Sequence, residues 1–205
     1  MQQSLPPLLA AKNGRARGYI DKILDLSGLV VEDMRAEDIP WLVDKELPQY
    51  LGLTTTEFVV DYMLGAKSSA LETLKVISWE DNESLYGKPA ICAIGKPNVA
   101  KEELQAISNR DIVVAVNGKF ALLGAALAAG YIDRRNIAFK RFGGNTEAAI
   151  GFKSADLALE IVSSGKTATA PKVKGGYGLE IYAPLFFIDL ALIANKNYLS
   201  QPRGG

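Results

Sequence analysis

The chain of 205 residues contains no histidine, and this absence excludes whole classes of catalytic site. Serine or cysteine nucleophiles activated by histidine are impossible, and so is any zinc site that needs imidazole. A single cysteine, Cys92, cannot form an intramolecular disulfide or a cysteine cluster. The cysteine content therefore does not indicate an oxidising compartment.

An excess of one charge is also missing, because 23 Lys and Arg balance 23 Asp and Glu, with no long run of either sign. Proteins that bind nucleic acid or a membrane surface usually show a basic face or tail, and this sequence shows neither. No window approaches the roughly 20 apolar residues of a transmembrane helix. The N-terminus also lacks the positive charge and the unbroken apolar stretch of an export signal. We expect a cytoplasmic protein that binds neither nucleic acid nor membranes.

Apolar residues make up 48% of the chain, enough for a sizeable core, and short apolar runs alternate with segments of helical period. This alternation is typical of α/β proteins. The expected strands cover residues 8–11, 29–31, 50–53, 89–94, 112–116, 137–142 and 155–162, with a strand or strand pair between 179 and 194. Helices are expected after the turn at 12–15, near Asp38, over 120–129, and after 54–57, where the residues have the spacing of a capping box.

Two glycine-containing positions, Gly87 and residues 174–176, divide the chain into two lobes. We predict that residues 1–87 and 171–205 form lobe I and that residues 88–170 form lobe II. A cleft between such lobes is the default place for a ligand.

The run Val-Ser-Ser-Gly-Lys-Thr at 162–167 follows an apolar strand and consists of small residues with one cation. Such a loop can turn successive backbone N–H groups toward a phosphate. A P-loop also ends in Gly-Lys-Thr, but it needs a glycine where this chain has Glu160, whose carboxylate would repel phosphates. Two interpretations stay open: an anion-binding loop of another kind, and an ordinary Ser/Gly turn.

Two further turns have residues suited to a ligand. Lys12 and Arg15 place cations at a strand-to-helix turn, where they are unfavourable for the helix, although solvated surface charges are the simpler interpretation. Residues 143–147, Gly-Gly-Asn-Thr-Glu, allow the backbone to approach a ligand. A plain N-cap with Glu147 in the first helical turn explains the same residues.

Five segments together resemble the catalytic subunit of ATP phosphoribosyltransferase, the entry enzyme of histidine biosynthesis, in the family's order along almost the whole chain. They are Lys-Asn-Gly-Arg at 12–15, Arg-Ala-Glu-Asp-Ile-Pro at 35–40, Leu-Gly-Leu-Thr at 51–54, Gly-Asn-Thr-Glu-Ala-Ala at 144–149 and the stretch from Ala-Asp at 155–156 to Thr167.

The resemblance implies a two-lobed α/β fold of the periplasmic-binding-protein-like (type II) kind, with a cleft between the lobes. It implies a magnesium-dependent transfer of phosphoribosyl from phosphoribosyl pyrophosphate to N1 of ATP. Residues 163–168 would bind the 5-phosphate. Lys12 and Arg15 would face the nucleotide or the pyrophosphate, and Glu160 would contact ribose hydroxyls or Mg²⁺, whose ligands stay open. The substrate-binding residues implied are Asn13, Gly14, Glu147, Ser163, Ser164, Gly165, Lys166, Thr167 and Ala168.

The chain ends before the C-terminal regulatory domain of the family's long form. We therefore expect a short form that is a homo-oligomer and works with a regulatory subunit similar to histidyl-tRNA synthetase. Three positions depart from the family pattern: Glu160 and Tyr50 each replace an Asp, and Thr55 replaces a Gly. These changes fall mostly on the nucleotide side. A non-catalytic paralogue that binds a phosphorylated small molecule on the same fold is the alternative expectation.

Overall fold

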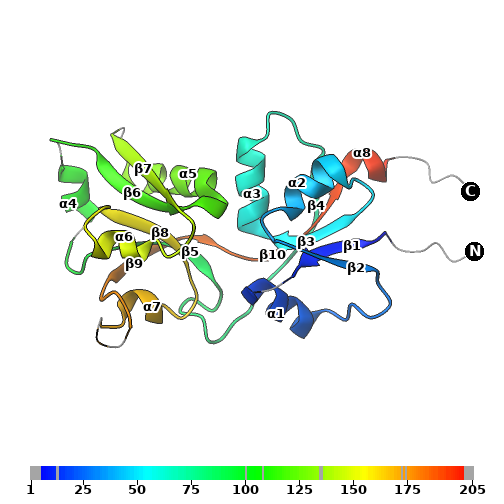
Figure 1. Ribbon diagram of the computed structural model, residues 1–205, viewed down its shortest axis with the longest axis horizontal. Helices are drawn as coiled ribbons and strands as arrows, with labels where there is room; N and C mark the ends of the chain where they lie inside the picture. The colour runs from blue at the N-terminus through cyan, green and yellow to red at the C-terminus, as the bar shows by residue number, and fades with distance from the viewer. Residues whose placement is uncertain are drawn as a thin grey trace, which may run out of the picture. The chain divides into compact units, whose positions relative to one another are not determined.

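The computed structural model describes residues 6–12, 14–99, 101–107, 109–133, 136–171, 173 and 175–200. The chain forms two compact units, each with its own sheet (Figure 1). Unit 1 comprises Met1–Trp79 and Asp189–Gly205, and unit 2 comprises Glu80–Ile188. The chain therefore leaves unit 1 once and returns to it for its last strand.

The sheet of unit 1 has the strand order β2-β1-β3-β10-β4. Its strands are β1 (Leu8–Ala11), β2 (Val31–Met34), β3 (Leu51–Thr55), β4 (Leu71–Ile77) and β10 (Leu190–Asn195). The first three run parallel, and β10 is antiparallel to both of its neighbours. The helical segments are α1 (Gly14–Ile23), α2 (Ile39–Trp41), the π-helical turn η1 (Leu42–Glu46), α3 (Thr56–Gly65) and α8 (Lys196–Leu199).

The core of unit 1 lies where α2 and η1 pack against the sheet. Leu9, Val43 and Ile193 are fully buried there. A Cβ built at Gly52 would lie 2.7 Å from a methyl group of Ile39, so only glycine lets the strand and the helix approach this closely.

The sheet of unit 2 has the strand order β7-β6-β8-β5-β9. Its strands are β5 (Ala90–Gly95), β6 (Ile112–Asn117), β7 (Ile137–Phe142), β8 (Leu157–Val162) and β9 (Glu180–Phe187). Strands β6, β7 and β8 are parallel, and β5 is antiparallel to β8 and β9. The helical segments are α4 (Lys101–Ala106), the 3₁₀ turn η2 (Gly118–Phe120), α5 (Ala121–Ile132), α6 (Glu147–Gly151) and α7 (Lys166–Thr169).

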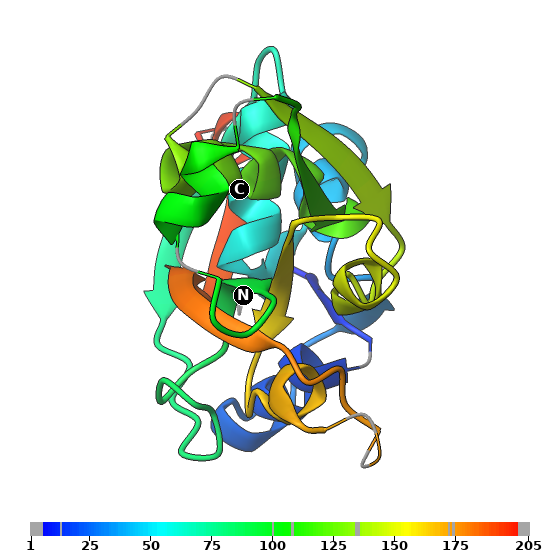
Figure 2. The same ribbon diagram turned by 90° about the vertical axis from the view of Figure 1, so that its left-hand side faces the viewer.

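Helices cover both faces of this sheet, as Figure 2 shows, with α6 and α7 on one face and α4 and α5 on the other. Strand β5 is buried along its whole length, as expected for a strand covered on both faces. Cys92 of this strand joins Ala149 of α6 and Ala168 of α7 in one apolar cluster. Strand β6 leads into η2 and α5, and strand β8 leads into α7. The loop between β8 and α7 is the one described in the next section.

The two mixed sheets confirm the predicted α/β class, and most of the expected strands are present. The crossings between the units differ from the predicted boundaries at 87 and 171, because they lie at 79/80 and 188/189. Residues 80–87 bond to the loop after β8, and β9 pairs with β5, so both segments belong to unit 2.

The predicted capping box at 54–57 is wrong. Thr55, one residue later than expected, is the N-cap of α3 and makes no side-chain capping bond. Its hydroxyl donates instead to Glu57 Oε1 at 2.7 Å. Among the residues that the structure describes, no helix is long and apolar enough to cross a membrane.

Candidate phosphate-binding site

The loop between β8 and α7 has the geometry of an anion cradle. Gly165 precedes α7 with a φ of +73°, a left-handed conformation that favours glycine. A Cβ built there would lie 3.0 Å from the Ile181 side chain, so space is short as well. Thr169 donates the first intrahelical bond, to the carbonyl of Gly165, which leaves the preceding N–H groups outside the helical ladder.

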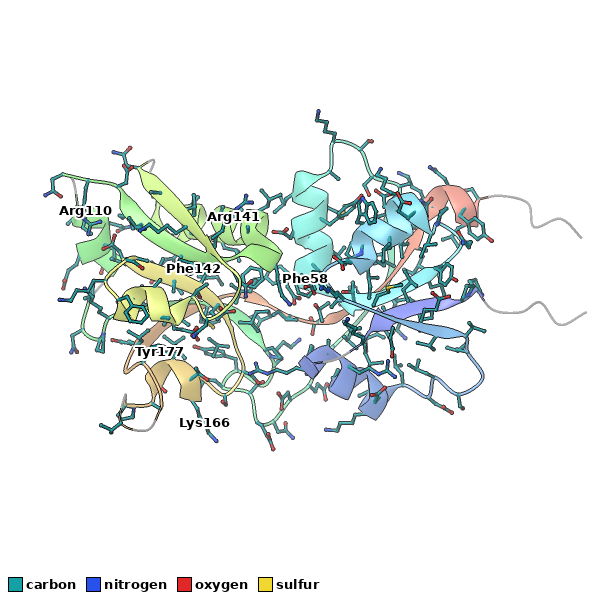
Figure 3. The ribbon with its side chains drawn as sticks, viewed as in Figure 1. Phe58, Arg110, Arg141, Phe142, Lys166 and Tyr177 are labelled. Atoms are coloured by element: carbon teal, nitrogen blue, oxygen red, sulfur yellow. The ribbon has the colours of Figure 1, made fainter. Side chains whose placement is uncertain are left out.

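Three side chains of this loop are exposed: those of Ser164, Lys166 and Thr167. Figure 3 shows Lys166 extending from α7 away from the sheet of unit 2. Within the described part of the chain, the two hydroxyls and the ammonium group meet no protein partner. These groups are therefore free to donate to a bound anion, whereas Ala168 is buried in the apolar cluster and offers only its backbone.

Ser163, also predicted to bind substrate, has its polar groups engaged within the protein. Its hydroxyl lies 2.8 Å from the Ser84 hydroxyl and donates to Asp81 Oδ2 at 3.4 Å. Its carbonyl accepts the N–H of Leu85 at 2.8 Å. Ser163 is thus hydrogen-bonded to residues 81–85, which lie at the start of unit 2 in the sequence.

Glu160, the predicted carboxylate before the loop, is held by donors on both oxygens. Oε1 accepts from the Asn117 side chain at 3.2 Å and from the Ile161 N–H at 3.1 Å. Oε2 accepts from the Thr146 N–H at 3.2 Å and from the Thr146 hydroxyl at 3.1 Å. These residues lie where β6, β8 and α6 meet, at the carboxyl edge of the parallel strands, the usual place for ligands in α/β sheets.

Glu147 opens α6 at this same edge and is 6% exposed. Burial raises the pKa of its carboxyl, and repulsion from Glu160 raises that pKa further, while its own backbone N–H opposes both effects. The two carboxyl groups therefore differ. Both oxygens of Glu160 accept hydrogen bonds, whereas the pKa of Glu147 lies above that of an ordinary glutamate.

Tyr177, labelled in Figure 3, links two of the predicted segments. Its hydroxyl accepts from the Asn145 side chain at 2.7 Å, and its N–H donates to the Thr167 carbonyl at 3.1 Å. Asn145 and Gly144 both have positive φ, which bends residues 143–146 ahead of α6. The turn at 143–147 and the loop at 163–168 are thus neighbours in unit 2.

Three predicted residues lie in unit 1, where Lys12 follows β1 and Gly14 and Arg15 open α1. Both cations are exposed, and Gly14 has a φ of +77°. The main chain of Lys12 continues the β1–β2 pairing, because its N–H donates to the Met34 carbonyl at 2.8 Å. Asn13 lies outside the described residues. The structure thus gathers these positions in one turn of unit 1 and the remaining predicted residues in unit 2.

Tyr50, which replaces an Asp of the family pattern, donates its hydroxyl to Glu32 Oε1 at 2.5 Å. This bond raises the pKa of the Tyr50 hydroxyl, with smaller effects from burial and from the charge of Glu32. The residue therefore ties β2 to the start of β3 and presents no carboxylate there.

A buried acid that the sequence reading missed lies at the start of α3. Glu57 is 2% exposed, and its Oε2 has no hydrogen-bond partner among the residues that the structure describes. Burial raises the pKa of this carboxyl to about 7, against the lowering effect of the Thr55 hydroxyl. The carboxyl group of Glu57 therefore has a pKa close to neutral pH inside unit 1.

A metal ion has no preformed cluster among the residues that the structure describes, since no group of three Asp, Glu or Cys side chains converges there. Glu160 fits a ligand role poorly, because both of its oxygens already accept two bonds. Mg²⁺ commonly binds through one or two carboxylates together with substrate phosphates. The residues present therefore suit a magnesium ion that arrives with a phosphorylated substrate better than a resident one.

Of four residues that shape the site, Thr146 lay in the predicted turn at 143–147, and the other three carried no recognisable sequence signal. Asn117 and Thr146 hold Glu160, and Asp81 and Ser84 hold Ser163. Each pair is 14 to 82 positions away from its partner in the sequence.

The fold and the loop define a class, namely two-unit α/β proteins with a mixed five-stranded sheet in each unit. Among solved structures, the chain is similar to the "ATP phosphoribosyl transferase (HisG:HisZ) complex from Thermotoga maritima", with a TM-score of 0.66 and 15% identity over 96% of this chain and 89% of that chain. At this identity the similarity shows the fold alone, and it confirms the fold class that the resemblance implied. No family model matches the sequence, and no curated protein does.

Proposed function

We propose that this chain is a phosphoribosyltransferase of histidine biosynthesis, which transfers phosphoribosyl from phosphoribosyl pyrophosphate to N1 of ATP in the cytoplasm. The observation that carries the proposal is the loop at 163–168. A left-handed glycine, with hydroxyl and ammonium groups that meet no partner in the described part of the chain, follows β8 in a fold similar to that of an ATP phosphoribosyl transferase. The same loop in an unrelated fold would support only anion binding.

The proposed reaction requires the protein to position the two substrates and to stabilise negative charge. The lone pair of adenine N1 attacks the anomeric carbon, and the bond from that carbon to the pyrophosphate oxygen breaks with its electron pair going to the leaving group. N1 carries no proton, so no general base is needed. The protein holds two polyanions in line and stabilises the departing charge.

The exposed donors among the predicted residues then each have a task. Ser164, Lys166, Thr167 and the backbone N–H groups of the loop hold the 5-phosphate. Lys12 and Arg15 neutralise pyrophosphate or nucleotide phosphates, which magnesium accompanies as part of the substrate. The absence of histidine is compatible with this chemistry, because no step requires a group that titrates near neutrality.

Glu147 supplies the polar contact to the sugar in this proposal. Its carboxyl oxygens can accept from a ribose hydroxyl, and its raised pKa means that it carries a negative charge beside the 5-phosphate less readily than an ordinary glutamate would. Glu160 keeps the start of α6 in place for that contact, since it holds Thr146, the residue before Glu147.

The direct test is incubation of the purified chain with ATP, phosphoribosyl pyrophosphate and Mg²⁺. The partner in the similar complex is HisZ, so the reaction is run with and without the host's synthetase-like subunit. We expect the absorbance of phosphoribosyl-ATP to appear, and faster with the subunit. Size-exclusion chromatography with light scattering tests the proposed homo-oligomer and its complex.

Gly165→Val is the variant that tests the loop, and Gly28→Val is its matched control. Gly165→Val places a branched side chain at a left-handed position beside Ile181, and we expect it to abolish phosphoribosyl pyrophosphate binding in a titration. Gly28→Val imposes the same kind of backbone strain in unit 1, because Gly28 has a φ of +84° with open space around it, and binding should survive there. Equal binding by both variants would remove the loop from the proposal.

A binding module without catalysis is the second candidate, and Tyr50 is the observation that favours it. Its hydroxyl engages Glu32 at a position where the family pattern has an Asp. The same incubation separates the two candidates. Tight binding of phosphoribosyl pyrophosphate without any product, with or without the synthetase-like subunit, identifies the module.

A further inference from the structure

A hydrogen-bonded turn, residues 81–87, braces the first residue of the phosphate-binding loop. The Ser84 hydroxyl donates to Asp81 Oδ2 at 2.7 Å and lies 2.8 Å from the Ser163 hydroxyl. Asp81 Oδ2 also accepts from Ser163 at 3.4 Å. These three side chains, which we call the brace, form a chain of two hydroxyls and one carboxylate.

The backbone supports the brace from both sides. Asp81 N–H donates to the Gly87 carbonyl at 2.8 Å and closes the turn, and Leu85 N–H donates to the Ser163 carbonyl at 2.8 Å. Asp81 Oδ1 accepts the Glu83 N–H at 3.0 Å. The carboxylate therefore has donors on both oxygens, and Ser84 is 7% exposed.

The brace fixes the direction in which the Ser163 hydroxyl donates its proton. A hydroxyl has one proton. The Ser84 proton goes to Asp81, so the Ser163 proton points to Ser84 or Asp81. With its proton committed, Ser163 has none to give to an anion. Its neighbour Ser164 has no such partner in the described residues and keeps its proton for a ligand.

We propose that Asp81 and Ser84 are positioning residues for the phosphate-binding loop. They act through Ser163, which they fix so that Gly165 and the donors after it face an anion before it binds. This inference rests on the proposed function of the loop and adds two residues, from a segment far away in the sequence, that never touch the ligand.

Packing at the glycine agrees with this role. A Leu85 methyl group lies 3.6 Å from the place where a Cβ of Gly165 would be, so the turn contacts the loop at two residues. Donors fixed in advance bind more tightly than equal donors on a mobile loop, because less ordering remains to be done on binding.

A double-mutant cycle measured by calorimetric titration with phosphoribosyl pyrophosphate tests the proposal. Ser84→Ala and Ser163→Ala should each weaken binding about five- to tenfold. The double variant should be no weaker than either single one, because both remove the same brace. Asp81→Asn should fall in the same range, since one amide oxygen cannot replace two carboxylate oxygens.

Ser164→Ala is the comparison variant, because Ser164 is a direct donor in the proposed site. Its effect should multiply with that of Ser84→Ala. Thermal unfolding of each variant shows whether a loss of affinity comes from a displaced loop or from a less stable fold. If Ser84→Ala lowers the melting temperature while the affinity of the folded protein stays unchanged, the brace is structural only and the proposal is overturned.

Failure of the brace can be told apart from failure of the proposed function. If the unmodified chain binds neither phosphoribosyl pyrophosphate nor inorganic phosphate, both ideas fall. If it binds and Ser84→Ala binds equally well, the brace alone is wrong. Multiplying effects of Ser84→Ala and Ser163→Ala would also overturn it, because Ser163 would then contact the anion directly.

Discussion

Thr146 gives both of its donors to a single oxygen of Glu160, the backbone N–H at 3.2 Å and the hydroxyl at 3.1 Å. Thr146 is fully buried, and no water can replace a lost partner without entry into the core. A residue predicted from the sequence to act in catalysis is therefore also a structural support of α6.

Glu160→Ala should lower the free energy of unfolding by about 1–3 kcal/mol, because buried donors on Thr146 and Asn117 lose their acceptor. Glu160→Gln keeps one acceptor oxygen and should lose less. Urea denaturation followed by circular dichroism measures both values. Glu46→Ala, on an exposed glutamate of unit 1, is the control and should change stability by no more than about 0.5 kcal/mol. Equal stabilities of Glu160→Ala and the unmodified chain would contradict the support role.

Glu147 should make ligand binding depend on pH. Its carboxyl has a raised pKa, so it stays neutral to higher pH than an exposed glutamate and then ionises as the pH rises. The new charge repels the phosphate, and affinity for ribose 5-phosphate should fall by about threefold or more with rising pH. Glu147→Gln should lose that part of the pH dependence. Calorimetric titrations at a series of pH values upward from the ordinary glutamate pKa of 4.5 compare the two proteins, with Glu46→Gln as the control. Parallel pH profiles would show that Glu147 does not face the ligand.

Local patterns predicted most strands because these strands are apolar along their length, as in β5, or at all but one position, as in β8. Strand β4 gave no such pattern. It is exposed over residues 72–76, where it carries Glu72 and Lys75, so neither alternation nor a continuous apolar run marks it. Its place in the sheet depends on pairing with β10, more than a hundred residues away.

The candidate site divides in the same way. Composition singled out the run at 162–167, because glycine and hydroxyl residues carry their conformational preferences with them, and the resemblance assigned residues 163–168 to a phosphate. The partners that commit Ser163 come from residues 81–85 and were invisible, since only the folded chain brings those residues to it. The boundaries between the units were missed for the same reason, because they depend on which strand pairs with β5.

Asp44 should anchor unit 1 through three donors. Its carboxylate accepts from the Tyr62 hydroxyl at 2.6 Å, the Ala70 N–H at 2.7 Å and Lys45 Nζ at 3.1 Å. Burial alone would raise the pKa of Asp44, and the hydrogen bonds outweigh burial, so the pKa lies below its usual value. Asp44→Ala should cost about 1–3 kcal/mol of unfolding free energy, because it leaves the Tyr62 hydroxyl and the Ala70 N–H without their acceptor.

The pH dependence of stability checks the same residue. A lowered pKa in the folded state means that stability is present above the unfolded pKa, 3.8, and is lost as the pH falls through the lower folded value. The unmodified chain should therefore lose stability below about pH 4 more steeply than Asp44→Asn. Tyr62→Phe is the matched variant and should remove a smaller part of the effect. Identical acid slopes for all three proteins would show that Asp44 does not carry it.

Glu57→Gln should stabilise unit 1 at alkaline pH. The pKa of Glu57 is raised from 4.5 to about 7, so between these values the folded state keeps a proton that the unfolded state has lost, and stability falls as the pH rises. The total loss is on the order of 3 kcal/mol, from about 1.4 kcal/mol per pH unit. Glutamine is neutral at every pH and should abolish this loss, so that the two proteins differ most near pH 8. Urea denaturation at pH 5, 6, 7 and 8 measures the difference, and Glu46→Gln should follow the unmodified chain throughout. If the difference in unfolding free energy between Glu57→Gln and the unmodified chain were constant across this range, Glu57 would not change its protonation state between pH 5 and pH 8, and the prediction would be wrong.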